Sequence, residues 1–492
     1  MRKLAVLTSL VLVLAMALPA AAQIETKFSG KVQTDLYYDQ YDGVWAWGEL
    51  KTKLEMSYGT EGAIRAVLGL GATESNADGK FGDPSSPLSK SNAINLNVET
   101  AYIQADGAWF EGLPSVTTKL GRFGTNYSDW VADLGNRDGI EVSNVSLGPV
   151  TVAGLYAWVN EAPMSSDNLF RRKPFVDEVK DEGKRGDAIN QFLKEFGEKD
   201  WRIAGLNASA DLDVVSLSGT FLTTYNDDDS DDRFNDYAVS ATMTPIDGLK
   251  LEATFAGTNY KVKDWVQGVT EPADPDDPYE FDTGLLEEKG TGYKLSAELT
   301  TIPDVTIGLS YWASDDEFNP IYAKLDDKKP VAFNGWDKRN ERKGFEVKAD
   351  TTQAGFDLGA TVKRTTDAND KNEATSYEIR VSRDFNGFKG SYKFEDSTAD
   401  DKYQIHTVTV ETTVDTPIAQ AVNLKGTVRY HEVDELQYAA DVTWQAPNGF
   451  NVGLHYASYD REDDWGGRDI GGDAKKGEAD GFVVKVGYTF EW

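Results

Sequence analysis

The chain has 492 residues and no cysteine, and its 82 acidic residues outnumber its 50 basic ones, which gives a formal net charge of −32. The lack of cysteine excludes disulfide bonds, thiolate metal sites and thiol nucleophiles. The negative charge argues against nucleic acid as a partner, because nucleic-acid binding needs a positively charged surface. A soluble chain of this length would normally fold as several domains.

The first 22 residues have the composition of a secretory signal peptide. A positive start at Arg2 and Lys3 precedes an almost wholly apolar run, and Ala20-Ala21-Ala22 supplies the small residues of a cleavage site. The run is too short for a transmembrane helix, and no other segment approaches the roughly 20 apolar residues that such a helix needs. We therefore expect export and cleavage, with residues 23–492 forming one mature domain.

Beyond this leader, apolar and polar residues alternate with a period of two to the last residue. In the first run Ile24, Phe28 and Val32 take even positions, whereas charged residues take most of the odd ones. Neighbouring side chains of a β-strand point to opposite faces, so the pattern predicts strands with one apolar and one charged face. We place about 22 such runs and expect between about 16 and 22 strands.

The connections between these runs are short at one end of each hairpin and long at the other. The short ones carry the Gly, Pro, Asn and Asp residues of tight turns, and they are residues 58–62, 146–149, 245–248, 302–304, 384–387 and 446–449. The long ones are polar, and they are residues 74–92, 124–137, 160–200, 261–289, 314–342 and 460–480. Every proline beyond the leader lies in a connection, as expected for residues that cannot donate to a strand ladder.

Two architectures fit alternating strands: a soluble β-sandwich that buries its apolar faces, and a membrane barrel that turns them toward lipid. The sandwich predicts interdomain linkers and mixed loop lengths, and the sequence has neither. We therefore predict an all-β fold, a transmembrane antiparallel up-and-down β-barrel with short periplasmic turns and long extracellular loops. Aromatic residues near the predicted strand ends suit the two membrane interfaces, and they are Tyr37, Tyr38, Tyr58, Trp109, Phe110, Trp158, Trp201, Trp312 and Trp444.

The last strand, which ends in Phe490 and Trp492, resembles the C-terminal assembly signature of bacterial outer-membrane β-barrels. Residues 119–123, 136–140 and 148–158 are similar to the fifth and sixth strand region of general porins. The resemblance implies an outer-membrane porin of a Gram-negative, diderm bacterium, a water-filled channel for passive diffusion of ions and small hydrophilic solutes. It also implies contact with outer-membrane lipid, recognition of the last strand by the barrel-assembly machinery, and a homotrimer.

In general porins the loop between these strands folds into the pore and narrows it. The corresponding segment here is 124–136, which contains Asp129 and Asp133. The resemblance therefore implies that these carboxylates form the acidic side of a constriction loop. The basic residues that would face them are Lys119, Arg122 and Arg137.

Charges on the first two strands should line the interior, because a Lys or Arg on the lipid side costs about 2–4 kcal/mol at the midplane. The predicted pore-lining residues are Glu25, Lys27, Lys31, Asp35, Glu49, Lys51, Lys53 and Glu55, with Lys119 and Arg122 from a later strand. Charges of both signs admit water and filter solutes by size and charge. The alternative is that these residues only pair across strands and keep the wall hydrated.

A wide barrel needs an obstruction, and the segment 160–200 is the strongest candidate. Ile189, Phe192 and Phe196 in this segment follow helical spacing. A short helix in or over the mouth, at 186–200, is one hypothesis, and an ordinary surface helix is the other.

Two acidic runs, 227–232 and 274–277, offer the oxygen ligands that suit Ca²⁺ or Mg²⁺, but without the spacing of an EF-hand. We expect solvated loop tips that bind these ions weakly at most, and no metal site or cofactor. Their charge would attract cations to the mouth, so we expect a cation-preferring channel.

The sequence carries no catalytic motif, so we expect no enzymatic activity. His406, His431 and His455 lie on separate predicted strands, and no nucleophile motif accompanies them. Two alternatives to a diffusion pore stay open. One is a substrate-selective channel lined by aromatic residues or by one sign of charge, and the other is a structural or adhesive barrel with a blocked lumen.

Overall fold

The computed structural model describes residues 24–39, 43–58, 64–75, 97–109, 114–159, 201–227, 232–270, 280–315, 318, 320, 322, 343–366, 373–398, 403–414, 421–431, 435–446, 449–457 and 481–491. The expected signal peptide, the expected helix at 186–200, the acidic run 274–277 and Trp492 lie outside the described residues. Among the residues that are described, no helix is long and apolar enough to cross a membrane.

The described residues form twenty-two β-strands, so the expected number is confirmed. Their bounds are β1 (Ile24–Asp39), β2 (Gly43–Tyr58), β3 (Ile64–Ser75), β4 (Asn97–Gly107), β5 (Val116–Ser128), β6 (Ala132–Leu147), β7 (Val150–Val159), β8 (Trp201–Leu212), β9 (Val215–Asn226), β10 (Arg233–Ile246), β11 (Leu249–Thr270), β12 (Glu280–Leu299), β13 (Val305–Ser314), β14 (Lys343–Gln353), β15 (Phe356–Thr366), β16 (Glu373–Asp384), β17 (Phe388–Ser397), β18 (Tyr403–Val414), β19 (Ala421–His431), β20 (Glu435–Gln445), β21 (Phe450–Ala457) and β22 (Gly481–Glu491).

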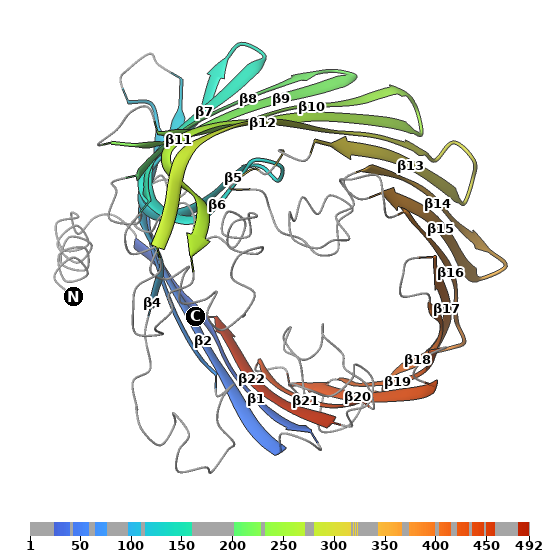
Figure 1. Cartoon of the computed structure of the whole chain (residues 1–492). Helices are drawn as coiled ribbons and strands as arrows, with labels where there is room; N and C mark the ends of the chain where they lie inside the picture. Colours follow the sequence, from blue (N-terminus) through green and yellow to red (C-terminus); the bar gives the residue numbers. More distant parts are fainter. Residues whose placement is uncertain are drawn as a thin grey trace. The chain divides into compact units, whose positions relative to one another are not determined.

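All twenty-two strands belong to one sheet. Consecutive strands pair antiparallel from β5 to β13 and from β16 to β22. Strand β1 pairs with β2 on one side and with β22 on the other (Figure 1). In the ladder of β1 with β22, Gly30 lies opposite Phe490. A sheet whose first and last strands pair has no open edge. The chain therefore has the topology of a closed antiparallel up-and-down β-barrel, as predicted.

The strands group into two compact units. Unit 1 comprises Met1–Ile103, Asp350–Thr361 and Ser376–Trp492, and unit 2 comprises Gln104–Ala349 and Val362–Thr375. Each strand has a turn end, which is the end next to the short connections such as 148–149, 213–214 and 247–248, and a loop end, which is the opposite one.

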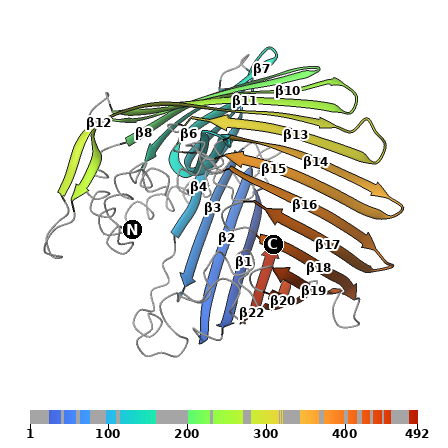
Figure 2. The same ribbon diagram turned by 45° about the vertical axis from the view of Figure 1, so that its right-hand side comes forward.

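In unit 1 the strands β16–β22 and β1–β3 lie side by side (Figure 2). One face of this unit is an exposed aliphatic band, in which Val410, Val428, Val442 and Leu454 are 40–49% exposed. Aromatic pairs bound the band at both ends. Tyr438 and Tyr456 meet near the loop end and Trp444 and Phe450 near the turn end, each pair with ring centroids 5.8 Å apart.

Unit 2 carries the same apolar face on β8–β12. Each of these strands presents an exposed large side chain, and these are Leu206, Phe221, Val239, Phe255 and Leu295. Period-two alternation requires the interleaved residues to point the other way. We call the side with the exposed apolar residues the apolar face of each unit and the other side the polar face.

The predicted turns are confirmed where they are described. Gly148, Gly248 and Gly449 have φ angles of 67°, 75° and 89°, which glycine adopts without a steric cost. At Gly449 a Cβ atom would also overlap the carbonyl oxygen of Thr489 on the neighbouring β22. Glycine is therefore required at position 449 both by its positive φ angle and by the lack of room for a Cβ atom.

Two expected loops are largely strand. Strand β5 continues to Ser128 and β6 starts at Ala132, so the expected loop 124–137 shrinks to 129–131. Of the expected loop 261–289, residues 261–270 and 280–289 are strand, because β11 and β12 extend as a ladder through register shifts near Val262 and Val266, and residues 271–279 lie outside the described residues. In both regions hydrogen-bonded pairing continues after the apolar alternation has ended, and only the alternation is visible in the sequence.

Candidate pore lining and the in-folded hairpin

The predicted pore-lining charges of β1 and β2 whose side chains are described lie on the face opposite the apolar side chains, and they are Glu25, Lys27, Lys31, Lys51, Lys53 and Glu55. Lys27 Nζ is 3.4 Å from a carboxylate oxygen of Glu25, and Lys53 Nζ is 2.9 Å from one of Glu55. Phe28 and Val32, which are 40% and 43% exposed, occupy the other face of β1. In the ladder Lys31 is opposite Lys51. The backbones of Asp35 and Glu49 lie opposite Trp47 and Gln33, and their side chains are outside the described residues.

Ion pairs between residues two apart on one strand recur around the polar face of both units. Each joins side chains that share a face and are partly exposed, so the pairs form a hydrated wall of both signs. The further pairs are Lys250–Glu252 at 2.7 Å, Arg380–Glu378 at 2.9 Å and Lys393–Glu395 at 2.9 Å.

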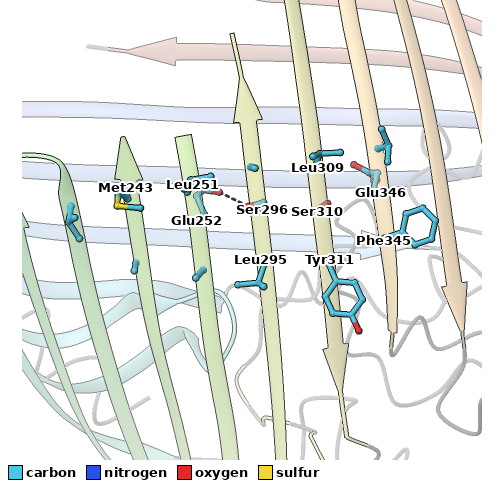
Figure 3. A pocket seen from close by; sticks show the side chains of 15 residues that line it. Met243, Leu251, Glu252, Leu295, Ser296, Leu309, Ser310, Tyr311, Phe345 and Glu346 are labelled. Atoms are coloured by element: carbon cyan, nitrogen blue, oxygen red, sulfur yellow. Dashed lines mark hydrogen bonds between the residues drawn. The ribbon is translucent and has the colours of Figure 1, made fainter. Parts of the chain in front are cut away.

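The wall is a single layer of strands, so neighbouring residues of one strand lie on its two opposite surfaces. Strands β11–β14 of unit 2 illustrate this (Figure 3). A groove of about 670 Å³ lies along its apolar face, where Leu251, Leu295, Leu309 and Phe345 line it. The interleaved residues are polar, and Ser296 donates a hydrogen bond of 3.2 Å to Glu252. Successive residues of each strand therefore lie alternately on an apolar surface and on a hydrophilic one.

Glu141 on β6 is the centre of a polar cluster that sequence reasoning missed. Its carboxylate is 3.1 Å from Lys119 Nζ, and it accepts hydrogen bonds from Tyr127 Oη at 3.3 Å and Thr125 Oγ1 at 3.5 Å. The Glu141 side chain is only 7% exposed. Lys119 thus lies on the polar face with its partner buried in the same hairpin, and its place in a pore lining stays a prediction.

Arg122 lies on the other face of β5. It is opposite Asp138 in the ladder and 3.8 Å from its carboxylate, in line with the exposed Leu120. The prediction that Lys119 and Arg122 share one face is wrong, because they are three positions apart in a strand whose side chains alternate with a period of two.

Within unit 2, the loop end of the β5–β6 hairpin folds onto the polar face of β8 and β9, on the concave side of these strands (Figure 1). Register shifts at Gly124, Asn126 and Ser128 bend this end away from a regular ladder. The carbonyl oxygen of Tyr127 accepts hydrogen bonds from Thr220 Oγ1 at 3.2 Å and from Asn207 Nδ2 at 3.5 Å. Asn207 Nδ2 also donates to Thr220 Oγ1 at 2.9 Å, so two neighbouring strands hold one carbonyl group.

The tip of the hairpin is apolar and packs against the segment that follows β13. Val131, Ala132 and Leu134 are at most 2% exposed. The amide of Asp133 donates to the carbonyl of Tyr322 at 2.7 Å. The rings of Trp130 and Phe318 lie 6.4 Å apart. These contacts attach the tip of the hairpin to the segment that follows β13.

The predicted constriction residues all lie in this hairpin. Asp129 accepts a hydrogen bond of 2.7 Å from Asn126 within the same turn. Asp133 is anchored through its backbone to Tyr322, and Arg137 is opposite Phe123 in the ladder and donates to the carbonyl of Asn136 at 3.1 Å. Their role in a constriction stays a prediction.

An aromatic core fills the polar face of β8–β11 behind the hairpin. Trp201, Phe234 and Tyr260 form a chain of ring contacts with centroids 5.4 and 5.1 Å apart, and Tyr260 donates to the buried Asp236 at 2.9 Å. Trp201 and Trp312 are 0% and 1% exposed. The prediction that Trp201 and Trp312 lie at a membrane interface, as Trp444 was also predicted to do, is therefore wrong.

Two of the described histidines pair with side chains on neighbouring strands. His406 pairs with Tyr392 at 2.8 Å, and His455 Nδ1 is 2.9 Å from Asp441 on the neighbouring strand. Within the described part of the chain, His, Asp and Glu side chains form no cluster of three or more that could hold a metal ion.

No protein-family model matches the chain, and no curated protein matches it. A structure of the P pilus usher PapC translocation pore is similar over 94% of this chain and 99% of its own, with 12% identity and a TM-score of 0.42. Acinetobacter baumannii OccAB3 is similar over 95% of this chain and 100% of its own, with 11% identity and a TM-score of 0.38. Pseudomonas aeruginosa OccK2 (OpdF), solved in complex with glucuronate, has 9% identity over 95% of this chain and 98% of its own, with a TM-score of 0.37. Likenesses this distant carry no argument about function.

Proposed function

We propose that the protein is an outer-membrane channel for passive diffusion of ions and small hydrophilic solutes. The observation that carries the proposal is the division of each strand into two surfaces. The apolar face is an uncovered aliphatic band bounded by aromatic rings, which is the surface that a bilayer covers. The polar face carries hydrated ion pairs such as Lys27–Glu25 and Lys53–Glu55, and a bilayer would exclude these from its side.

The proposal places the chain in the outer membrane of a Gram-negative bacterium, after export and removal of the leader. The last strand, with Phe490 and Trp492, would be recognised by the assembly machinery. The protein would function as a homotrimer, which light scattering of the detergent-solubilised protein tests directly.

We further propose that the channel prefers cations. The paired charges of the wall nearly cancel, so the selectivity would come from the acidic run 227–232 and from the overall charge of −32. Salt should weaken such selectivity, because exposed charges are screened beyond about 10 Å at 0.1 M.

The test is single-channel recording of the purified protein in planar bilayers. Ohmic steps support a diffusion pore, and a reversal potential in a KCl gradient gives the sign of selectivity. Asp228, Asp229 and Asp231 are the residues of the run to neutralise to Asn, because Asp227 pairs with Arg202 and Asp232 accepts the amide of Lys263. The triple variant should lose cation preference at low salt and keep its conductance at high salt. An anion-selective wild type would contradict the proposal.

One observation favours a substrate-selective channel as a second candidate. The polar face of β8–β11 is occupied by a packed core and by the β5–β6 hairpin, which reduces the space open to water on that side. Liposome swelling separates the two candidates, because flux through a general pore rises linearly with solute concentration and flux through a selective one saturates. A protein that inserts without conductance would support a structural barrel instead.

A further inference from the structure

Arg383 is a cation on the apolar face of unit 1, at the turn end of β16. The residues that share its face along the strand include Tyr377 and Ile379, which are 42% and 48% exposed. Across the ladder Arg383 is opposite Gly390, which is two residues from the exposed Tyr392 on the same face of β17. The guanidinium therefore projects on the side that a bilayer would cover.

Two aromatic rings hold this guanidinium. Its central carbon lies 4.5 Å from the ring centroid of Phe356 and 5.2 Å from that of Phe385. Phe385 belongs to the β16–β17 turn and is 53% exposed, and its ring lies over Gly390, where a side chain would crowd it. Cation–π contacts on two sides limit the rotamers of the arginine, so its donors are positioned before any ligand binds.

The charge of Arg383 is not compensated within the described part of the chain. The nearby Asp384 accepts the amide of Gly387 at 3.1 Å and so faces into its own turn. Two other arginines on the apolar face do have acidic partners, since Arg202 is 3.6 Å from Asp227 and Arg122 is 3.8 Å from Asp138. Ring contacts do not use the in-plane N–H donors of the guanidinium, which are the ones that bind oxyanions in pairs.

We propose that Arg383, with Phe356 and Phe385, binds the phosphate of an anionic phospholipid headgroup in the leaflet at the turn end. The inference rests on the membrane placement in the proposed function. A guanidinium forms paired, charge-assisted hydrogen bonds with phosphate oxygens. The turn end is where the headgroups lie, and the exposed aliphatic residues beside Arg383 give the acyl chains of the same lipid an apolar surface.

The experiment measures lipid selectivity of the refolded full chain in phosphatidylcholine vesicles that contain a trace of spin-labelled phosphatidylglycerol. One basic residue near a membrane surface contributes about 1 kcal/mol, so R383Q should lower the relative association constant about fivefold at the site. R383K keeps the charge but loses the paired geometry, and it should fall between R383Q and the wild type. R202Q, which removes an arginine already paired with Asp227, should bind like the wild type.

Equal lipid selectivity of R383Q and the wild type overturns the proposal. Equal loss in R202Q and R383Q also overturns it, because it indicates general surface charge. Inorganic phosphate at millimolar concentration should not displace the labelled lipid, and displacement would mean a free-anion site instead. Far-UV circular dichroism shows whether R383Q folds, and R383K gives the answer if it does not. Conductance of the same vesicles tests the channel separately: silent vesicles with intact lipid selectivity contradict the channel alone, and failure to insert contradicts the membrane placement.

Discussion

Thr220 donates its hydroxyl hydrogen to the main-chain carbonyl oxygen of Tyr127 across 3.2 Å, although the two residues are 93 positions apart in the chain. The bond fastens the folded end of the β5–β6 hairpin to the polar face of β9. Asn207 adds a second donor from β8. The hairpin is thus held by side chains that carry no charge, and its attachment should be insensitive to salt.

The double variant N207L/T220V should release the hairpin end. It removes two donors from one carbonyl group and keeps the volumes nearly constant, which weakens the attachment by about 1–3 kcal/mol. We expect a larger or noisier single-channel conductance. The matched control is S240A/T254V, which removes a hydroxyl pair of 2.9 Å between β10 and β11 that does not touch the hairpin. An identical change in both variants would show that the hairpin does not limit the current.

Replacement of Glu141 by Gln should destabilise the fold. Glu141 is nearly buried and is the partner of Lys119, so the neutral variant leaves a half-buried ammonium group without its counter-charge. We expect a loss of about 1–3 kcal/mol in the free energy of unfolding, measured by urea denaturation. The well-exposed pair Glu25–Lys27 is the comparison, and Glu25→Gln should change the same quantity by less than about 0.5 kcal/mol. A similar effect in both variants would contradict the assignment.

Quenching by brominated lipids tests which tryptophans meet the bilayer. Trp444 lies on the apolar face beside Phe450, and Trp201 lies in the buried core of the polar face. Trp444→Phe should therefore lower the quenched fraction of the fluorescence. Trp201→Phe should lower the total emission and raise that fraction. The opposite pattern would reverse the two faces of the sheet.

Alkaline pH should weaken the packing of the β5–β6 hairpin tip against the segment that contains Tyr322. Burial raises the pKa of the Tyr322 hydroxyl from 10.0 to about 12. Because the folded pKa is the higher one, the contribution of this group is complete below pH 10 and is lost as the pH rises through about 12. The difference in unfolding free energy between the wild type and Tyr322→Phe should change across that window by up to about 3 kcal/mol. A difference independent of pH would show that the hydroxyl is solvated.

Much of the architecture could be predicted because the two faces of a strand differ in polarity, and this difference appears in the sequence as an alternation of apolar and polar residues. The alternation around Phe28 and Lys27 gave the faces of β1, and the glycines at 248 and 449 marked the turns. The number of strands follows from these two signals alone.

The remainder depends on information that alternation does not contain. Residues 261–270 and 280–289 extend a ladder, but their sequences mix polar and apolar residues without a period of two, so they resemble a loop. Trp201 is near a strand end, as an interface residue would be, but its parity with Ile203 places it on the covered face. That signal was present in the sequence. The pairing of Lys119 with Glu141 was not, because it needs the register of β5 against β6.

The ladder between β1 and β22 also governs the order of folding. The other described ladders join consecutive strands, so they can form as soon as a hairpin exists, whereas Gly30 meets Phe490 across nearly the whole chain. Loop-closure entropy makes such a pairing slow compared with hairpin formation. Until it forms, both terminal strands present unpaired amides and carbonyls that can recruit other chains. The time spent before that final step, more than the strength of any single ladder, should decide how much of the protein aggregates on refolding.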